Sequence, residues 1–192
     1  MVGLVLLAVF ANWASPYNPL AMNSARTLEP PSADHVFGTD HAGRDVLSRV
    51  IHGTRVALWV GVVSVGIGTV AGIFFGIVSY WRGAADMVVQ RATDGLLAFP
   101  TLILAITLVA VLGPGITNAM IAIGIVMMPQ MARLVRSSVL SVRENTYVEA
   151  AVAVGARDPA IIWRHVLPNI MAPVVVVATA GLARAILVEA SL

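Results

Sequence analysis

The sequence contains no cysteine and no lysine, and only 11% of its 192 residues are charged. The absence of cysteine excludes disulfides, thiolate metal sites and cysteine nucleophiles. The absence of lysine excludes a Schiff-base lysine and the phosphate-binding loop that ends in Gly-Lys-Ser/Thr. All twelve basic residues are therefore arginines. Whatever energy source the protein uses, this chain has no phosphate-binding loop of its own.

Hydrophobic residues make up 58% of the chain, and the mean hydropathy is +0.87. In soluble proteins roughly a quarter of the residues are charged, so this composition indicates an integral membrane protein. The pI near 9.7 depends on a net charge of only +2, which does not indicate binding of nucleic acid. The expected fold class is all-α, a polytopic bundle of membrane helices in a single domain.

The N-terminal part predicts the end of one span followed by a loop. Residues 1–11 are apolar and uncharged, but a span needs about 20 residues. A signal peptide would begin with positive charge, so the end of a transmembrane helix is favoured over the alternative of a cleaved signal. Residues 12–55 contain four prolines and predict an extracytoplasmic loop. Within it, residues 46–51 suggest a short amphipathic helix that ends at Gly53 and lies on the membrane surface.

Longer apolar runs predict four further spans. The clearest is the uncharged run between Arg55 and Arg82, and another long run is divided by a Gly-Pro-Gly turn at 113–115. Pro100 and Pro129 are expected to kink their helices. Together with the partial first span, these four runs give an expected total of about five membrane spans. The four cover residues 56–81, 95–112, 116–132 and 170–190, with a polar loop at 82–94 and a cytoplasmic region at 133–169.

Three glycines recur every four residues in the first of these runs, at Gly68, Gly72 and Gly76. This small-residue pattern lets helix backbones approach closely in lipid, so the three glycines are candidate helix-packing positions. The alternative is that glycine is simply common in membrane helices.

A polar island at residues 146–169 predicts two short helices joined by a turn. Thr146 and Glu149 have the spacing of a capping box, which starts a helix directly after Thr146. Gly155 can take the left-handed conformation that ends a helix. Asp158 is expected to be the N-cap of the next helix, with Pro159 as its first residue.

The first of these helices is lined with small side chains, and a proline follows the second. Ala150, Ala151 and Ala153 are too small to fill a core, but they suit close approach by another surface. Pro168 is expected to bar further regular helix. The island is therefore a candidate contact surface.

The island resembles the EAA motif of the membrane subunits of ABC-type importers. The matching residues are Glu149-Ala150-Ala151, then Gly155 after three residues, then His165-Val166-Leu167-Pro168 after nine. The general pattern has isoleucine at the position of His165. The version here is similar to the branch that carries dipeptides, oligopeptides and nickel. Leu97-Ala98-Phe99-Pro100 and an extracytoplasmic motif also resemble that branch, the latter formed by Gly38, Thr39, Asp40, Gly43, Arg44 and Asp45.

The resemblance implies a multi-pass permease subunit with six spans in the cytoplasmic (inner) membrane of a bacterium or archaeon. Two such subunits, identical or different, would pair in the lipid membrane on top of two ABC ATPase subunits, and an extracytoplasmic binding protein would deliver the solute. The subunit would be non-catalytic and hold no cofactor, because ATP would be bound by the partner. No metal site and no nucleic-acid partner is expected.

Carried over residue by residue, the resemblance assigns the island to coupling helices that dock into the ATPase. Leu167 and Pro168 would direct the chain into the next span. The chain departs from the family in lacking the start of the first span and a sixth span, which suggests a fragment or a truncated gene, and in having Arg184 where a small residue is usual. The expected docking positions are Glu149, Ala150, Ala151, Gly155, Ala156, Arg157, Asp158, Leu167 and Pro168.

Several residues keep two interpretations. Glu149 can contact an arginine of the ATPase, act only in the capping box, or do both. Arg184 and Glu189 can pair across a helix interface, which is favoured, or line the exit of a pathway. Asn118 and Gln130 are expected to pack rather than to line a pathway. The histidines and aspartates of the extracytoplasmic loop, His35, Asp40, His41, Asp45 and His52, match no metal-ligand spacing.

Two other classes of protein are alternatives. A secondary transporter would place ionisable residues at mid-membrane, but residues 56–81 and 95–132 contain none. An intramembrane protease would need a motif such as His-Glu-x-x-His, which is absent. The arginine count supports a cytoplasmic island without deciding the orientation, because residues 133–164 hold five arginines and the outer segment 12–55 holds four.

Overall fold

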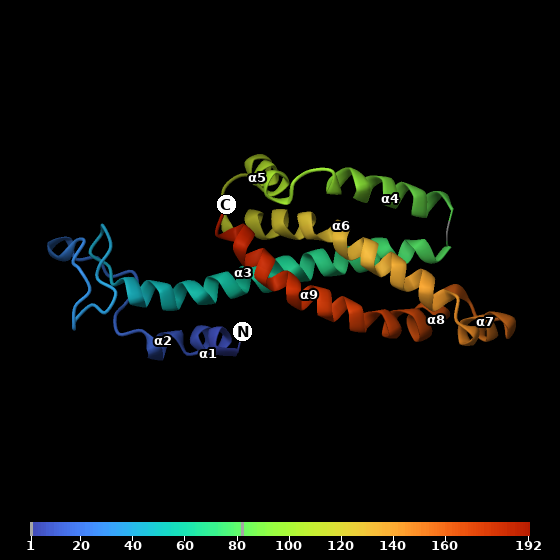
Figure 1. Ribbon diagram of the computed structural model, residues 1–192, viewed down its shortest axis with the longest axis horizontal. Coiled ribbons are helices and arrows are strands. Elements are labelled where there is room, and N and C mark those ends of the chain that lie inside the picture. Colours follow the sequence, from blue (N-terminus) through green and yellow to red (C-terminus); the bar gives the residue numbers. More distant parts are fainter. Residues whose placement is uncertain (1, 82) are drawn as a thin grey trace. The chain divides into compact units, whose positions relative to one another are not determined.

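The computed structural model describes residues 2–81 and 83–192, so Met1 and Arg82, which bound two of the predicted segments, lie outside the described residues. These residues form helices joined by short connections and one long loop, with an isolated bridge between Thr39 and Asp45 and no strand in the described ranges (Figure 1). The all-α prediction is confirmed. The chain divides into two compact units, Met1–Trp59 and Val60–Leu192.

The first unit combines short helices with a long loop. Its helices are α1 (Val2–Val9), α2 (Ala11–Ala14), the 3-10 turn η1 (Ser24–Arg26) and the first part of α3 (Val46–Ile77). The Asp45 carboxylate accepts a hydrogen bond of 2.8 Å from the backbone N–H of Ser48, which caps the start of α3.

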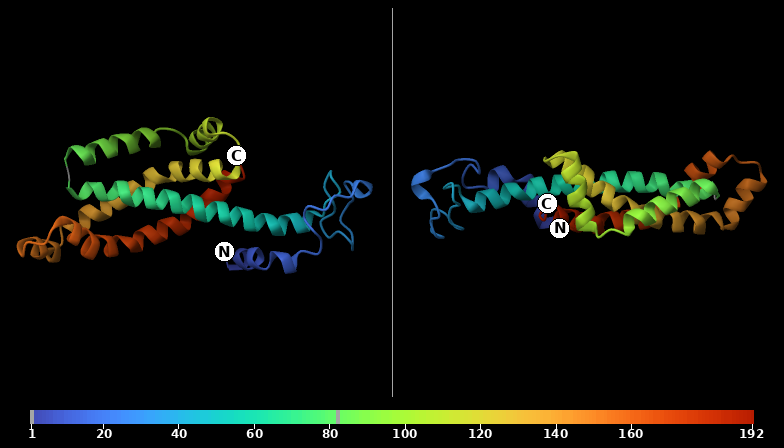
Figure 2. Two further views of the ribbon diagram at one scale, coloured as in Figure 1. Left: turned by 180° about the vertical axis from the view of Figure 1, so that it is seen from behind. Right: turned by 90° about the horizontal axis from the view of Figure 1, so that it is seen from above.

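The second unit is a helical bundle in which α6 occupies the central position. α6 packs against α9, α5 and α4, and against the short segments at its C-terminal end (Figures 1 and 2). After α3 the elements are η2 (Val78–Trp81), α4 (Ala84–Leu97), α5 (Thr101–Leu112), α6 (Ile116–Arg143), α7 (Thr146–Ala153), α8 (Asp158–Ile161), the π-helical segment η3 (Ile162–Val166) and α9 (Leu167–Glu189).

The helix predicted to end at Gly53 does not end there. α3 runs without interruption from Val46 to Ile77. A glycine inside a helix weakens it by only about 1 kcal/mol relative to alanine, and the long apolar run that follows Gly53 favours continuation. The surface helix and the first complete predicted span are therefore parts of one helix.

The polar loop expected at 82–94 was also wrong, because Ala84–Leu97 forms α4. The run predicted as one span at 95–112 is broken before Pro100, and the axes of α4 and α5 differ by 97°. The residue before a proline avoids the helical conformation, so the chain turns there and Pro100 precedes the first residue of α5. Pro100 thus separates two helices instead of kinking one.

Among residues 2–81 and 83–192, three helical stretches are long and apolar enough to cross a membrane, and a fourth is added if the bent pair α4 and α5 counts as one span. The three are Val46–Trp81, Ile116–Arg143 and Asp158–Glu189. As described, α1 has 8 residues and is shorter than a span. The five spans stay a prediction.

Two clusters of buried side chains stabilise the bundle. The first joins α3, α6 and α9 through Val60, Ile123 and Ala185, with Val65 and Met120 beside them. The second lies at the C-terminal half of α6, where this helix meets η2, α7, α8, η3 and the start of α9. It contains Tyr80, Met131, Val135, Val139, Val148, Ile161, Val166, Ile170 and Val174, and we call it the α7-end cluster.

The glycines at four-residue spacing face α6. A Cβ atom added at Gly72 would lie 2.5 Å from the Cβ of Met131, and one at Gly76 would lie 2.5 Å from the Cβ of Val135. At Gly68 it would lie 2.9 Å from the carbonyl oxygen of Gly124. These distances are too short for any side chain, so the close approach of α3 and α6 requires glycine. We call this contact the glycine seam.

We expect Gly72→Ala to destabilise the protein by about 1–3 kcal/mol, because the added methyl group overpacks the contact with Met131. Gly66→Ala is the matched control on the same helix, since a Cβ there meets nothing within 4 Å. The measurement is the thermal unfolding midpoint of each variant in lipid nanodiscs. Equal midpoints for the two variants would contradict the seam.

Candidate docking site at the α7 and α8 segment

The turn between α6 and α7 is organised by Asn145. Its side-chain amide donates hydrogen bonds to the carbonyl oxygens of Ser141 (3.2 Å) and Val142 (3.1 Å), at the end of α6. Its own carbonyl oxygen accepts the N–H of Val148 at 2.9 Å, at the start of α7. One residue therefore ends one helix and begins the next.

The predicted capping box was wrong. α7 begins at Thr146, and its N-cap is Asn145, which makes no side-chain capping hydrogen bond. Thr146 lies inside the helix and cannot act as the cap. The carboxylate of Glu149, on the first turn and exposed, is therefore not needed for a box and faces solvent.

The end of α7 follows the prediction for Gly155, whose φ is +82°. The N–H of Gly155 bonds to the carbonyl of Val152 at 2.9 Å, and that of Ala156 bonds to the carbonyl of Ala151 at 3.0 Å. This pair of bonds is the Schellman arrangement. It closes the helix and fixes the direction of the chain toward α8.

Asp158 does not cap α8 as expected. α8 starts at Asp158 itself, the residue before it makes no side-chain cap, and Pro159 lies in the first turn. A carboxylate oxygen of Asp158 instead accepts a 2.9 Å hydrogen bond from the indole N–H of Trp81. The bond links α8 to the end of the helical stretch that contains α3.

Pro168 does not end the helix, contrary to the sequence prediction. The residues before it form the π-helical segment η3, in which the N–H of Leu167 reaches the carbonyl of Ile162. A proline ring clashes with the carbonyl four residues earlier in a regular helix, and the wider π turn relieves this clash. Leu167 and Pro168 consequently start α9 in line with α8.

The docking residues predicted from sequence divide into two groups. Ala151, Ala156 and Leu167 pack on the α7-end cluster. The others are exposed and lie on α7, in the turn that follows it, at the start of α8 and at the start of α9. They are Glu149, Ala150, Gly155, Arg157, Asp158 and Pro168.

The anchor of this surface is Val148, which is 2% exposed and packs with Val139 and Ile161 in the α7-end cluster. Burying one such side chain stabilises by about 1.5–3 kcal/mol. α7 is thereby fixed to the end of α6, while its outer face is unobstructed.

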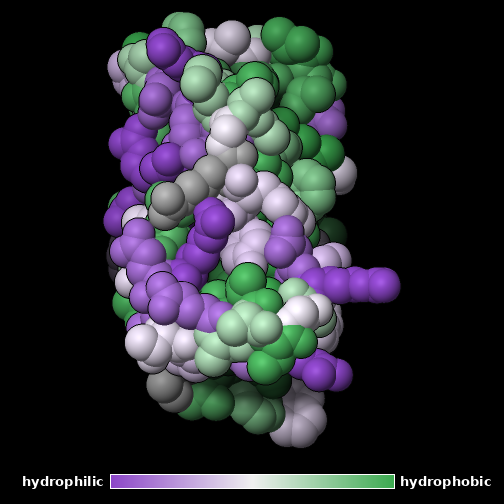
Figure 3. Space-filling model, turned by 90° about the vertical axis from the view of Figure 1, so that its right-hand side faces the viewer, coloured by the Kyte–Doolittle hydropathy of each residue, from purple (hydrophilic) through white to green (hydrophobic). Residues whose placement is uncertain are grey.

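Several large apolar side chains on α7 and on the segments that follow it are exposed, although the sequence motif did not predict them. Val154 is 85% exposed and Trp163 is 72% exposed, and Tyr147 and Val152 are exposed as well. Figure 3 faces this end of the molecule and shows hydrophobic side chains beside hydrophilic ones. Exposed apolar residues rimmed by polar ones are typical of a protein contact surface. The sequence feature that indicates this surface is the presence of apolar residues within the polar island at 146–169.

A depression of about 530 Å³ lies beside α7. Arg143 forms part of its wall, donates a hydrogen bond of 2.8 Å to the carbonyl oxygen of Tyr80 and has its guanidinium carbon 5.3 Å from the centre of the Tyr80 ring. Two carboxylates, Glu149 and Asp158, also line the depression. An apolar or basic side chain of another protein fits these properties. The lining residues are Tyr80, Trp81, Arg143, Val148, Glu149, Val152, Ala153 and Asp158.

Ion pairs hold α4 against α6. The guanidinium of Arg136 donates two hydrogen bonds of 2.9 Å to the two carboxylate oxygens of Asp86, and Arg133 lies 2.7 Å from Asp94. Asp86 is 8% exposed, and a buried carboxylate needs such a partner. The pairs explain why the residues expected in a polar loop form a packed helix.

The pairing expected between Arg184 and Glu189 is not among the ion pairs of residues 2–81 and 83–192. Arg184 instead donates a 3.0 Å hydrogen bond to the side-chain oxygen of Gln130. Asn118 donates to the carbonyl oxygens of Leu112 (2.9 Å) and Gly113 (3.1 Å), so its amide closes the end of α5.

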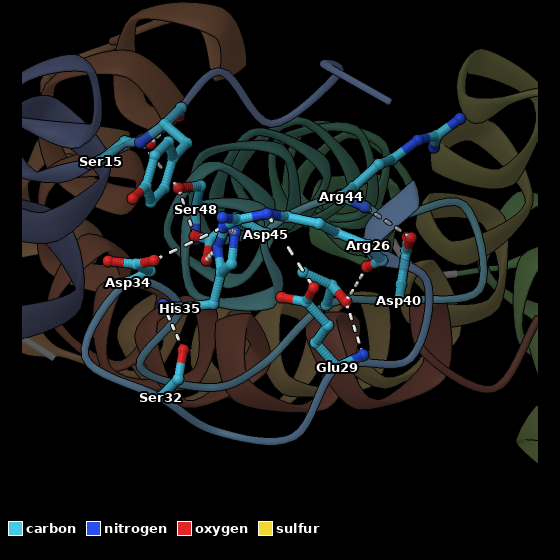
Figure 4. A network of polar contacts seen from close by, with 12 residues as sticks. Ser15, Arg26, Glu29, Ser32, Asp34, His35, Asp40, Arg44, Asp45 and Ser48 are labelled. Atoms are coloured by element: carbon cyan, nitrogen blue, oxygen red, sulfur yellow. Dashed lines mark hydrogen bonds and ion pairs between the residues drawn. The ribbon is translucent and has the colours of Figure 1, made fainter. Parts of the chain in front are cut away.

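The extracytoplasmic motif forms a network of polar contacts within the first unit (Figure 4). One carboxylate oxygen of Asp40 accepts the N–H groups of Ala42 at 2.8 Å and Arg44 at 3.0 Å. The turn brings Gly43 so close to Asn23 that an added Cβ would lie 1.8 Å from the Asn23 carbonyl oxygen. The motif therefore acts as a turn with Asp40 as its cap.

His35 and Asp45 join the two ends of this loop. Nδ1 of His35 lies 2.9 Å from a carboxylate oxygen of Asp45, and the hydroxyl of Ser48 donates to the other oxygen at 2.6 Å. Nε2 of His35 lies 3.3 Å from the guanidinium of Arg26. Of the residues considered for a metal site, His35, Asp40 and Asp45 thus make hydrogen bonds within this segment. No cluster of ligands suited to a metal occurs among the described residues.

These contacts lower the pKa of both aspartates. The backbone N–H of Arg44 holds the pKa of Asp40 below its usual value, with help from Ala42 and Arg49 against a smaller effect of burial. Burial by itself raises the pKa of Asp45, but hydrogen bonds from Ser48 and His35 outweigh it and bring that pKa below its usual value. The loop is therefore stabilised by ionised carboxylates.

Comparison with known proteins places residues 68–192 in a family described as the binding-protein-dependent transport system inner membrane component. A putative peptide transport system permease protein of Brucella suis is 42% identical over 197 residues, which cover 100% of this chain and 67% of that protein. The dipeptide transport system permease protein DppC of Alkalihalophilus pseudofirmus is 42% identical over 100% of this chain and 64% of its own length.

A third relative is the di/tripeptide transport system permease protein DppC of Pseudomonas aeruginosa, 41% identical over 100% of this chain and 66% of that protein. The chain thus spans about two thirds of the length of these relatives.

Acid is expected to loosen the loop of the first unit. Because Asp40 and Asp45 have lowered pKa values in the folded state, their contribution to stability is complete above the usual value of 3.8 and is lost as the pH falls through the lowered values. Hydrogen-exchange protection factors for residues 23–48 should therefore stay constant above about pH 5 and decrease as the pH falls below about 4.

The variant Asp40→Asn should show lower protection than the wild type at pH 7 and a smaller decrease on acidification. Asp34→Asn is the matched control, because the Asp34 side chain is 69% exposed. The same pH profile for Asp40→Asn and the wild type would refute the role of the Asp40 carboxylate.

Proposed function

The chain belongs to the family of inner membrane components of binding-protein-dependent transport systems, and from this membership we propose that it is the permease subunit of an ATP-driven importer of short peptides. Peptides are preferred to nickel because the relatives described above carry names of peptide and dipeptide transport systems. The subunit itself is non-catalytic and multi-pass, and it lies in the cytoplasmic membrane.

The surface of α7 and α8 is the docking element for the ATPase subunit in this proposal. The observation that supports docking at this surface is that the two faces of α7 differ. Val148 is buried at 2% exposure, whereas Glu149 and Ala150 face outward. A helix fixed on one side and free on the other can bind without ordering itself first, which lowers the entropic cost of association.

The connections of α7 and α8 suit the transmission of a movement to the bundle. Asn145 joins α7 to α6, Trp81 joins α8 to the end of the α3 stretch, and η3 joins α8 to α9. A displacement of the docked segment would therefore act on three membrane helices at once. ATP binding and hydrolysis belong to the partner, since this chain has no lysine for a phosphate-binding loop.

The further partners in the proposal are a second permease subunit, identical or different, and an extracytoplasmic binding protein. Residues 12–55 face the binding protein, and residues 133–169 face the ATPase. The polar network around Asp40 and Asp45 gives the outer segment a defined shape for that contact.

Gly155→Asp tests the docking surface. A Cβ at Gly155 meets nothing within 4 Å, so the added side chain projects outward and blocks an incoming partner. Its positive φ of +82° also strains the backbone of the turn, and the control variant must therefore carry the same strain. We expect at least a tenfold loss of ATPase subunit co-purified with the complete transporter, the size of effect typical of a central interface residue.

Gly83→Asp is the matched control, because Gly83 also has a positive φ, of +92°, and open space at its Cβ but precedes α4 and is not part of α7 or α8. Undiminished co-purification of the ATPase with Gly155→Asp would refute docking at this surface. The variant Glu149→Gln tests separately whether the charge of Glu149 contacts the ATPase subunit, since it removes only the charge. Unchanged association with the ATPase subunit would exclude a charge contact at Glu149.

A further inference from the structure

Arg184 and Gln130 form a polar pair in the middle of an apolar bundle. Gln130 is at the midpoint of α6, 14 residues beyond Ile116, which corresponds to a depth of about 21 Å along the helix. Arg184 lies on α9 and donates to the Gln130 side-chain oxygen at 3.0 Å. Both side chains are exposed on the surface of this chain.

A guanidinium at this depth cannot face hydrocarbon at low cost. In the part of the chain that the structure describes, the polar partner of Arg184 is the amide of Gln130, which is neutral and takes one of the five N–H donors of an arginine. The charge of Arg184 is therefore available to a ligand, and the face that carries it must meet water, a solute or another protein.

Two cavities lie beside the pair. One of about 20 Å³ includes Thr69 in its wall, and one of about 90 Å³ includes Thr101, while Gln130 and Arg184 line both. These volumes suffice for one or a few water molecules. The described residues that line the two cavities include no carboxylate, so the local potential favours an anion.

We propose that Arg184, Gln130 and Thr101 form a contact site for the carboxylate of a peptide during its passage through the membrane, an inference that rests on the proposed function. The planar guanidinium matches a carboxylate through two parallel hydrogen bonds. The amide of Gln130 orients the guanidinium without neutralising it. A single cation with a neutral partner binds weakly enough to release the solute, as a transport pathway requires.

The absence of cysteine from the chain permits a direct test. Arg184→Cys introduces one thiol in this chain, and methanethiosulfonate reagents then attach either a positive aminoethyl group or a negative ethylsulfonate group. The complete transporter is reconstituted in proteoliposomes, and uptake of a dipeptide is measured together with the ATPase activity stimulated by loaded binding protein. Arg91→Cys, on α4 and away from both cavities, is the matched control, and the wild-type complex treated with both reagents controls for thiols of the partners.

We expect Arg184→Cys to lower uptake about tenfold, the effect of losing one charge-assisted contact, while ATPase stimulation persists. The aminoethyl group should restore most of the uptake, and the sulfonate should not. A thiol that fails to react in the assembled transporter, or equal effects of the two reagents, would overturn the proposal and place Arg184 against the second permease subunit or lipid.

Gln130→Glu provides an independent test if Arg184→Cys fails to assemble. The new carboxylate would pair with Arg184 and compete with the solute, so uptake should again fall about tenfold with the transporter intact. Unchanged uptake would overturn the proposal. A wild-type transporter without peptide uptake or ATPase stimulation would contradict the proposed function itself.

Discussion

The close approach of α3 and α6 is the constraint on which the bundle depends. At Gly72 the Met131 side chain occupies the space that a Cβ would need, at 2.5 Å. In lipid there is little hydrophobic drive between helices, so close packing of small residues supplies much of the association. The seam sets the position of α6, and α6 in turn carries the contacts to α4, α5, α9 and α7.

Two polar pairs in this bundle have different roles, and they differ in how exposed they are and in whether the partner is charged. Asp86 is buried and held by two hydrogen bonds from Arg136, an arrangement that satisfies both charges and leaves nothing for a ligand. Arg184 is exposed and has a neutral partner. The first pair stabilises the packing of α4 on α6, whereas the second provides a charge that packing alone does not require.

The proposed docking end combines rigidity with exposure. Capping by Asn145, the Schellman turn at Gly155 and the buried Val148 fix α7 in place. The indole of Trp81 fixes Asp158. Asp158 is thus engaged within this chain, whereas Glu149 and Ala150 are exposed on α7 and are free to meet a partner.

The sequence by itself determined the membrane class, the all-helical fold, the family and the turn at Gly155, because composition, long apolar runs and a left-handed glycine depend on local chemistry. The N-cap of α7 is a local feature that was predicted one residue too late, at Thr146 instead of Asn145. Only the tertiary structure decided the partner of Asp158, the helix at α4 and the continuation through Pro168. Those outcomes depend on residues distant in sequence, such as Trp81 for Asp158 and Arg136 for Asp86, or on a π turn that no local pattern announced. Side chains with several available partners are assigned by the packing of the whole bundle, and this is why local rules predicted them incorrectly.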